Sequence, residues 1–185
     1  MFEDLKIILY PDPRLKKMSA PITAFDERLR LLAARMFELM REAKGVGLAA
    51  PQVGQNVRMF VMNATQEPDN DRVYVNPVLS DPEGEEEQEE GCLSLPGIHI
   101  NVVRSTQFRM QAQDLDGNPI DEVATGFVAR VWQHEFDHLN GTMLTDRMGP
   151  VARMTHRRIL SDLKEQYEVL NPPAPPAKRP ARRKV

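Results

Sequence analysis

The sequence has a single cysteine and no long apolar run. One thiol cannot form a disulfide within its own chain, so Cys92 is either a small buried side chain or a chemically used one. Because no stretch of about 18 apolar residues occurs, we expect no membrane-spanning helix. Residues 1–6 lack the basic start and apolar core of a signal peptide, and the sequence shows no Ser/Arg-rich transit segment.

What the sequence contains is typical of one globular domain. A chain of 185 residues with 41% apolar residues and a net charge of −3 is large enough to bury its own core. We therefore expect a single domain over residues 1–170. Residues 171–185 are rich in proline and alanine and end in a basic stretch. That composition cannot form a core, so this tail is expected to be disordered.

Hydrophobic periodicity predicts three helices. Apolar residues recur at helical spacing over 29–40, where Thr23 and Asp26 read as a capping pair at the start and Gly45 as the stop. Further helices are predicted over the following ranges: 128–139, which ends at Asn140-Gly141, and 150–170.

Alternating and β-branched residues predict strands between these helices. The expected strands are 57–63, 73–79, 98–103, 107–113 and 120–125, and the last two form a hairpin. The acidic stretch 81–90 is expected to be a solvated loop. The fold class is therefore α+β. We expect small antiparallel or mixed sheets around a central metal-binding helix, with one helix near each end of the chain.

The strongest chemical signal is the motif His134-Glu135-x-x-His138. Two histidines four residues apart on a helix project from the same side, so both imidazoles can bind one divalent metal. A carboxylate at Glu135 could then take a proton from water that the metal acidifies. A helix with two surface histidines is the unremarkable alternative.

A catalytic metal site of this kind needs three protein ligands and one open position. Cys92 is the only thiol that could complete the set, and a metal would hold it as thiolate. A closed structural zinc site would need a fourth ligand. His99 lies in a strand pattern and is expected to be half-buried, and His156 lies on a helix surface beside Arg157, so neither is a good candidate.

Helical spacing also places Phe127 and Val131 on the same stripe as His134 and His138. This stripe indicates either ordinary core packing or an apolar groove for an unbranched side chain beside the metal. The glycine-rich segment 45–54 is likewise either a tight structural crossing or part of a site. Gln52 is the one polar side chain there that could donate a hydrogen bond into a cavity.

Three segments together resemble the three motifs of the peptide deformylase family, in order and in spacing. They are Gly45-Val46-Gly47-Leu48-Ala49-Ala50-Pro51-Gln52, Glu90-Gly91-Cys92-Leu93-Ser94 and Gln133-His134-Glu135-Phe136-Asp137-His138. The likeness covers residues 5–168. Residues 96–98, 129–130 and 146–148 are most similar to the branch shared by plant organelle enzymes and some bacterial ones. Since no transit peptide is seen, the resemblance implies a cytoplasmic, bacterial protein.

The resemblance implies a metal-dependent hydrolase that removes the formyl group from N-formyl-methionyl nascent peptides. It implies that Cys92, His134 and His138 bind the metal and that Glu135 is the general acid/base. The family metal is usually Fe²⁺, whereas the ligand types alone would suggest Zn²⁺. Ni²⁺ or Co²⁺ could occupy the same site.

The resemblance also implies how substrate is held. The oxyanion would be stabilised by the amide of Gln52 and the backbone N–H of Leu93. The residues expected to line the substrate backbone, which adds like an extra strand, are Val46, Gly47, Glu90 and Gly91. We expect a monomer without membrane contact. The C-terminal helix and basic tail would meet the ribosome, or the tail would simply aid solubility.

Two other functions remain open at this point. A zinc endopeptidase would share the His-Glu-x-x-His chemistry, although such enzymes usually take their third ligand downstream of the motif. A non-enzymatic binding module stapled by a metal would unfold on chelation and turn over no peptide.

Overall fold

The computed structural model describes residues 2–172. Its longer helices are α1 (Glu27–Glu42), α2 (Gly126–Leu139), α3 (Pro150–Thr155) and α4 (Arg157–Leu170). Its strands are β1 (Gly47–Ala49), β2 (Met59–Met62), β3 (Arg72–Glu83), β4 (Glu86–Cys92), β5 (Leu95–Arg104), β6 (Gln107–Gln113) and β7 (Pro119–Thr125). Short 3₁₀ turns include η2 (Ala50–Val53), directly after β1.

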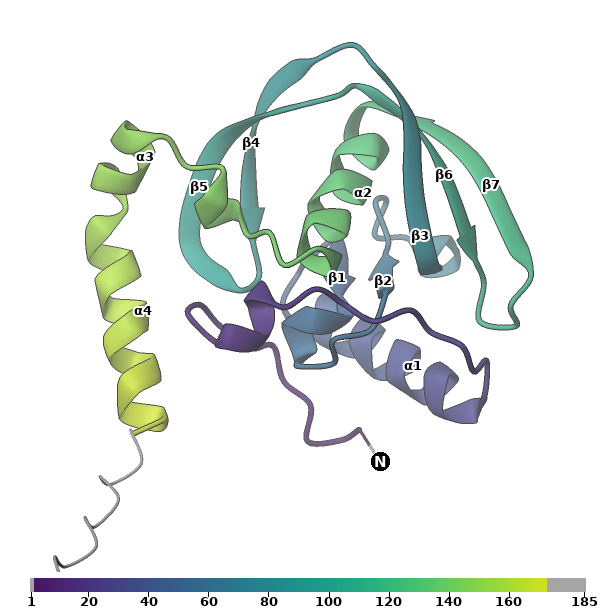
Figure 1. Cartoon of the computed structure of the whole chain (residues 1–185), viewed down its shortest axis with the longest axis horizontal. Helices are drawn as coiled ribbons and strands as arrows, with labels where there is room; N and C mark the ends of the chain where they lie inside the picture. The colour runs from purple at the N-terminus through teal and green to yellow at the C-terminus, as the bar shows by residue number, and fades with distance from the viewer. Residues whose placement is uncertain (1, 173–185) are drawn as a thin grey trace, which may run out of the picture.

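The strands form two sheets with α2 between them (Figure 1). One sheet has five strands in the order β1-β2-β3-β6-β7, and the other is the β4–β5 pair. Every strand pair in both sheets is antiparallel. The predicted α+β class with small sheets around a central helix is confirmed, and so is the β6–β7 hairpin.

The acidic stretch is not the solvated loop that the sequence suggested. β3 extends to Glu83, and β4 begins at Glu86 and pairs with β5 from Glu86↔Arg104 to Gly91↔His99. Most glutamates here stand on exposed faces of the strands, where charge is compatible with an extended backbone. Only Glu90 is buried. Backbone pairing therefore decided the structure of this stretch, and its composition did not.

Two helix predictions also need correction. The α1 helix is capped by Asp26, whose side chain accepts from the N–H of Leu29, and not by Thr23. At the C-terminal end two helices replace the single one that was predicted over 150–170. The break falls at His156, whose Nε2 lies 3.0 Å from the carbonyl oxygen of His99 on β5. This contact ties the interruption to the two-stranded sheet.

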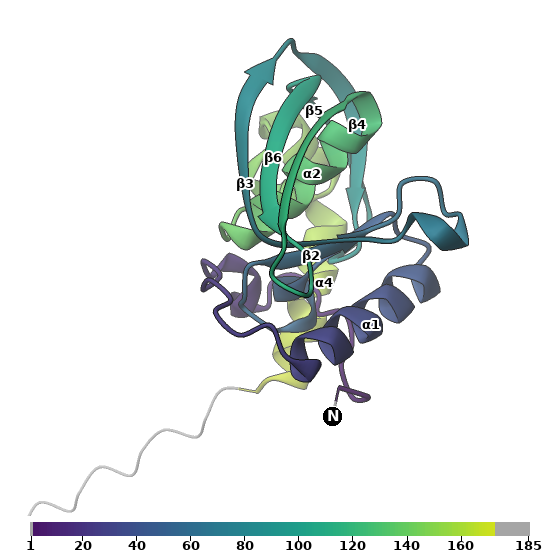
Figure 2. The same cartoon turned by 90° about the vertical axis from the view of Figure 1, so that its right-hand side faces the viewer.

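Three hydrophobic clusters fix α2 and its surroundings. One joins α1 to β1 and β2 through fully buried residues such as Met36 and Leu48. A second packs Trp132 of α2 against the five-stranded sheet, and a third joins β5 to the helices near the C-terminus. The α1 helix lies at the base of the molecule, below β2, in Figure 1 and in Figure 2. Because α2 is packed into this frame, its polar side can be positioned closely.

The apolar run at residues 5–10 does not form a strand. It crosses the molecule as an irregular segment in which the N–H of Ile8 donates to the carbonyl of Gln52 (2.8 Å) and that of Tyr10 to the carbonyl of Ser94 (3.0 Å). Within residues 2–172, no helix has the length and apolarity needed to cross a membrane. The predicted tail lies, from residue 173 onward, outside the described residues.

Candidate metal centre

The three predicted ligands come together at the junction of α2 and the β4–β5 pair. The helix supplies His134 and His138, and the last residue of β4 supplies Cys92. Their ligand atoms all lie within 4.8 Å of one another, and Sγ of Cys92 is 3.3 Å from Nε2 of His138. It is the one such His/Cys/Asp/Glu cluster found in the part of the chain that the structure describes.

The two histidines differ in charge before a metal binds. Burial by itself would lower the pKa of His134, but its contacts with Cys92 and Glu90 outweigh burial and raise the pKa well above the ordinary value. Nδ1 of His134 lies 3.0 Å from Oε2 of Glu90, so Nδ1 keeps its proton, and Nε2 becomes a ligand when it gives up its own. Burial, followed by the positive neighbours, lowers the pKa of His138 well below its ordinary value. A neutral imidazole results, which is the form that binds a metal.

Glu90 is ionised although it is buried. Burial by itself would raise its pKa, but hydrogen bonds from Arg104 and His134 outweigh burial and hold the pKa well below the usual range for a carboxyl group. Arg104 binds both oxygens of Glu90 at 2.9 Å, and Arg130 donates to Oε1 at 2.7 Å. This carboxylate therefore links a metal-site histidine to two buried guanidinium groups.

Glu135 lies beside the cluster and is 4% exposed. Its Oε2 has no hydrogen-bond partner among the described residues, and burial raises the pKa of the group to about 7. Gly47 on β1 leaves room for this side chain, because a Cβ atom at that position would collide with Oε1 of Glu135. The carboxyl group is thus held close to the backbone of β1 with an oxygen free for another partner.

The amide of Gln52 has a fixed orientation. Its Oε1 accepts from the N–H of Ala49 at 2.8 Å, while Nε2 lies 3.5 Å from Sγ of Cys92 and 3.3 Å from Oγ of Ser94. The NH₂ group is therefore turned toward the cluster. The side chain of Leu93 lies against Gly45, where a Cβ atom would meet it at 2.7 Å.

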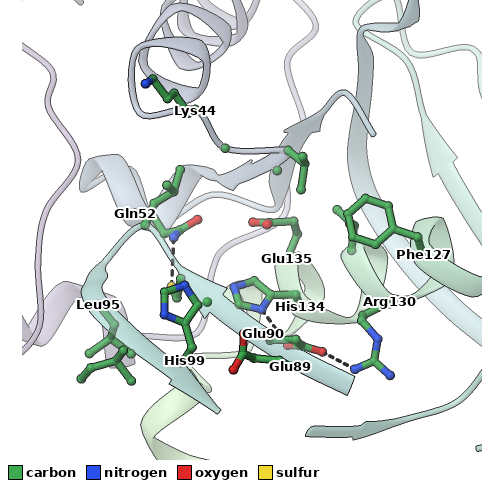
Figure 3. A pocket seen from close by; sticks show the side chains of 18 of the residues that line it. Lys44, Gln52, Glu89, Glu90, Leu95, His99, Phe127, Arg130, His134 and Glu135 are labelled. Atoms are coloured by element: carbon green, nitrogen blue, oxygen red, sulfur yellow. Dashed lines mark hydrogen bonds and ion pairs between the residues drawn. The ribbon is translucent and has the colours of Figure 1, made fainter. Parts of the chain in front are cut away.

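A cavity of about 320 Å³ opens beside this centre (Figure 3). It is lined by every residue predicted for substrate contact and by Cys92, His134, Glu135, Gln52 and Leu93. The predicted substrate-contact residues are Val46, Gly47, Glu90, Gly91, Phe127 and Val131. Val131 is buried, whereas Phe127 is 52% exposed at the cavity. The helix stripe is therefore partly core and partly cavity wall.

Other lining residues were not predicted, namely Lys44, Glu89, Leu95, Gly97, Ile98, His99 and Arg130. His99 is exposed, not half-buried as expected. It pairs with Gly91, and its ring occupies the space where a Cβ of Gly91 would be. This contact depends on the pairing of β4 with β5, which could not be read from the sequence. Arg130 could have been predicted to lie near the site, because it is four residues before His134 and therefore on the same face of the helix.

The residues present fit a divalent metal. One thiol and two imidazoles form a ligand set that suits Zn²⁺ and other first-row transition metals. His134 also has the carboxylate partner that metal-binding histidines usually have. Glu135 directly follows His134 in α2 and precedes His138 by three residues, and its Oε2 has no hydrogen-bond partner among the described residues. Such an arrangement can bind a metal, polarise a carbonyl group and move a proton.

Comparisons with known proteins give a consistent result. The family model described as polypeptide deformylase matches residues 4–154. A peptide deformylase of Chromobacterium violaceum is 43% identical over 162 residues, which cover 88% of this chain and 95% of that protein.

Two solved structures are similar to this one over almost their whole length. A peptide deformylase 1B of Arabidopsis thaliana, crystallised with an inhibitor, has 37% identity and a TM-score of 0.86, covering 95% of this chain and 98% of its own. A peptide deformylase of Legionella pneumophila has 41% identity and a TM-score of 0.83, covering 88% and 96%.

Proposed function

Because the chain belongs to the peptide deformylase family, we propose specific roles for the residues around Cys92, His134 and His138. Members of the family are metal-dependent hydrolases that remove the formyl group from the N-terminus of nascent peptides, and this chain is an enzyme of that kind. The family match decides against the zinc endopeptidase and the non-enzymatic module. The observation that carries the assignment of roles is the convergence of one thiol and two imidazoles beside a buried carboxylate.

Cys92, His134 and His138 would hold one divalent metal, with Fe²⁺ as the native ion. The family resemblance supports Fe²⁺, and the ligand set also suits Zn²⁺, Ni²⁺ or Co²⁺. When bound, the metal would act as a Lewis acid that polarises the formyl carbonyl and makes water more acidic.

Glu135 is the general acid/base. It takes a proton from the attacking water and delivers it to the nitrogen of the leaving amine, so that formate and a free N-terminus result. Its position supports this role, because it directly follows His134 in α2, lines the cavity and keeps Oε2 without a partner among residues 2–172.

The Nε2 of Gln52 and the backbone N–H of Leu93 stabilise the oxyanion that forms as water adds to the carbonyl. The hydrogen bond from Ala49 to Oε1 supports this role of Gln52, because it leaves only the NH₂ group to face the cavity. A donor that is already oriented requires no rearrangement during the reaction.

The substrate backbone lies between β1 and β4, along Val46, Gly47, Glu90 and Gly91. Both strands support this placement because each is the edge strand of its sheet and both border the cavity. A peptide can therefore add to them through main-chain hydrogen bonds. The methionine side chain of the substrate enters the apolar part of the cavity beside Phe127 and Val131.

Glu135→Gln tests the assignment of roles. The variant should retain its metal and lose nearly all deformylation of formyl-Met-Ala-Ser, because it keeps the shape of Glu135 but cannot accept the proton. Cys92→Ala is the matched control and should lose the metal as well. Metal analysis and formate release measure the two effects separately. Wild-type rates in Glu135→Gln would remove this residue from the mechanism.

We also propose that the protein is a cytoplasmic, bacterial enzyme, a location that its bacterial relatives support. We propose further that it acts as a monomer. The α4 helix and the basic segment after it would contact the ribosome through phosphate groups of RNA. Truncation after Leu170 should reduce co-sedimentation with ribosomes at low salt. Unchanged co-sedimentation would reject this contact.

A further inference from the structure

The side of α2 that faces the β4–β5 pair carries a stripe of polar residues. Arg130, Gln133, His134 and Asp137 follow one another at spacings of three, one and three residues, which places them on one face of the helix. Each of them bonds to the β4–β5 pair or to Ser105, the residue directly after it. The contact between the element that carries two ligands and the element that carries the third is therefore made largely by polar side chains.

Arg130 makes three bonds in this contact, to both strands of the pair. Its Nη1 donates to Oε1 of Glu90 (2.7 Å) and to the carbonyl of Val102 (2.9 Å), and its Nη2 donates to the carbonyl of Glu86 (2.7 Å). The side chain is 7% exposed, so these bonds are shielded from water. Figure 3 shows the guanidinium group turned toward Glu90 at the edge of the cavity.

The two arginines that bind Glu90 differ in what they connect. Arg104 belongs to β5, so its bonds to Glu90 stay within the β4–β5 pair, and its bond to the helix is to Asp137. Arg130 belongs to α2 and reaches Glu90 from the helix, one turn before His134. It therefore holds the carboxylate from the same element that carries the histidine.

From these contacts we infer that Arg130 is a positioning residue of the metal centre. It fixes the Glu90 carboxylate against Nδ1 of His134 and holds the strand that ends in Cys92 against the helix. The three ligands are thus brought together before a metal arrives. This inference rests on the ligand set given under the proposed function.

The chemistry of arginine suits this task. Its planar guanidinium group presents five N–H donors in fixed directions and remains charged when buried. A lysine at the same position would keep the charge, but a single ammonium group cannot reproduce donation from two separated nitrogens to three acceptors. Charge alone is therefore expected to restore only part of the effect.

The test compares Arg130→Met and Arg130→Lys with the wild-type chain. Co²⁺ is titrated into the metal-free proteins in competition with a chelator, and the thiolate-to-cobalt absorption band reports the bond to Cys92. We expect Arg130→Met to bind Co²⁺ roughly 10–100-fold more weakly, as is typical when a partner of a metal ligand is lost. The Co²⁺ affinity of Arg130→Lys should fall between those of Arg130→Met and the wild type.

Arg58→Met is the matched control. Arg58 is a partly buried arginine, more exposed than Arg130. It bonds to Asn140 at the end of α2 and lies 5.3 Å from the ring of Phe136, and no hydrogen bond joins it to Glu90. We expect its Co²⁺ affinity to equal that of the wild type. Equal weakening in Arg58→Met and Arg130→Met would show a general loss of stability and overturn the inference.

The remaining outcomes distinguish a failure of this inference from a failure of the proposed ligand set. If the wild-type chain binds Co²⁺ without a thiolate band, the ligand set is wrong and the inference falls with it. If the wild type shows the band and Arg130→Met binds Co²⁺ with unchanged affinity, only the role of Arg130 is rejected. A lower affinity in Arg130→Met with partial rescue in Arg130→Lys supports the inference. Melting of the metal-free proteins by circular dichroism shows that each variant is folded.

Discussion

Gly47 on β1 and Glu135 on α2 approach so closely that a methyl group on the glycine would collide with the Oε1 atom of the glutamate. Gly47 is the first residue of an edge strand, and Glu135 is the proposed general acid/base. The absence of a side chain on one element therefore determines where the carboxylate on the other can lie.

Gly47→Ala should reduce turnover strongly. The added methyl would displace Glu135 from the position it occupies beside the cluster, and a displacement of about 1 Å can cost roughly 10²-fold in rate. Metal content should be unchanged, since none of the three proposed ligands is touched. Steady-state deformylation kinetics and metal analysis measure the two quantities.

Gly149→Ala is the control for that experiment. No atom lies within 4 Å of a Cβ built at Gly149, and the backbone there has φ −70°, which any residue adopts. This variant should keep the wild-type rate. A Gly47→Ala enzyme with the same rate as Gly149→Ala would mean that the position of Glu135 tolerates the displacement.

Met36→Ala should destabilise the fold without changing the rate of the folded enzyme. Met36 is fully buried in the cluster between α1 and the first strands, away from the metal centre. Truncation of a buried methionine leaves a cavity and costs about 2–5 kcal/mol. Urea denaturation gives the loss. Met18→Ala, at a side chain that is 75% exposed, should change the free energy of unfolding very little.

Asp12 should give the protein a pH-dependent part of its stability. Burial by itself would raise the pKa of Asp12, but hydrogen bonds from Arg14 outweigh burial and lower it from the ordinary value of 3.8. A carboxyl group with a lowered pKa in the folded state stabilises the fold above its unfolded pKa, and this contribution is lost as the pH falls through the folded pKa. Asp12 also caps the 3₁₀ turn Pro13–Lys16, because its side chain accepts from the N–H of Arg14 at 2.9 Å, so Asp12→Ala should cost about 1 kcal/mol at pH 7.

The cost of Asp12→Ala should shrink as the pH is lowered below about 4, because the unfolded chain then takes up a proton at this carboxyl group more readily than the folded protein does. Urea denaturation at neutral and acidic pH measures the difference. Asp162→Ala, at an exposed carboxylate on α4, serves as the reference for effects of net charge. A cost for Asp12→Ala that stays constant over the whole pH range would contradict the prediction.

The parts of the fold that the sequence predicted well are those with a local signal. The helix carrying His134 and His138 was predicted from periodicity and from Asn140-Gly141, and the structure ends α2 there. The β6–β7 hairpin was predicted from its turn. The β4 strand was missed because its stability comes from pairing with β5, a non-local contact that charged residues such as Glu86 do not announce.

The site shows the same division. The three proposed ligands could be chosen from residue types and helical spacing, since the chain offers one cysteine and one histidine pair at that spacing. The contacts of Glu90 with Arg104 and Arg130 could not, because they join three separate elements. The alternation of β5 puts His99 on the exposed face, between the buried Ile98 and Ile100. Its place beside Gly91 depends on the register of β4 and β5, which the sequence alone does not give.

The irregular segment at residues 5–10 has a consequence for how this enzyme can be modified. The N–H of Ile8 donates to the carbonyl of Gln52, the residue proposed to stabilise the oxyanion, and the N–H of Tyr10 donates to the carbonyl of Ser94, in the turn that follows Cys92. Fusion partners or deletions that disturb residues 8–10 would remove these two hydrogen bonds and make the proposed site less rigid, although every proposed catalytic side chain would still be present. Residues 8–10 should therefore be left unchanged when this enzyme is engineered, and labels should be attached elsewhere.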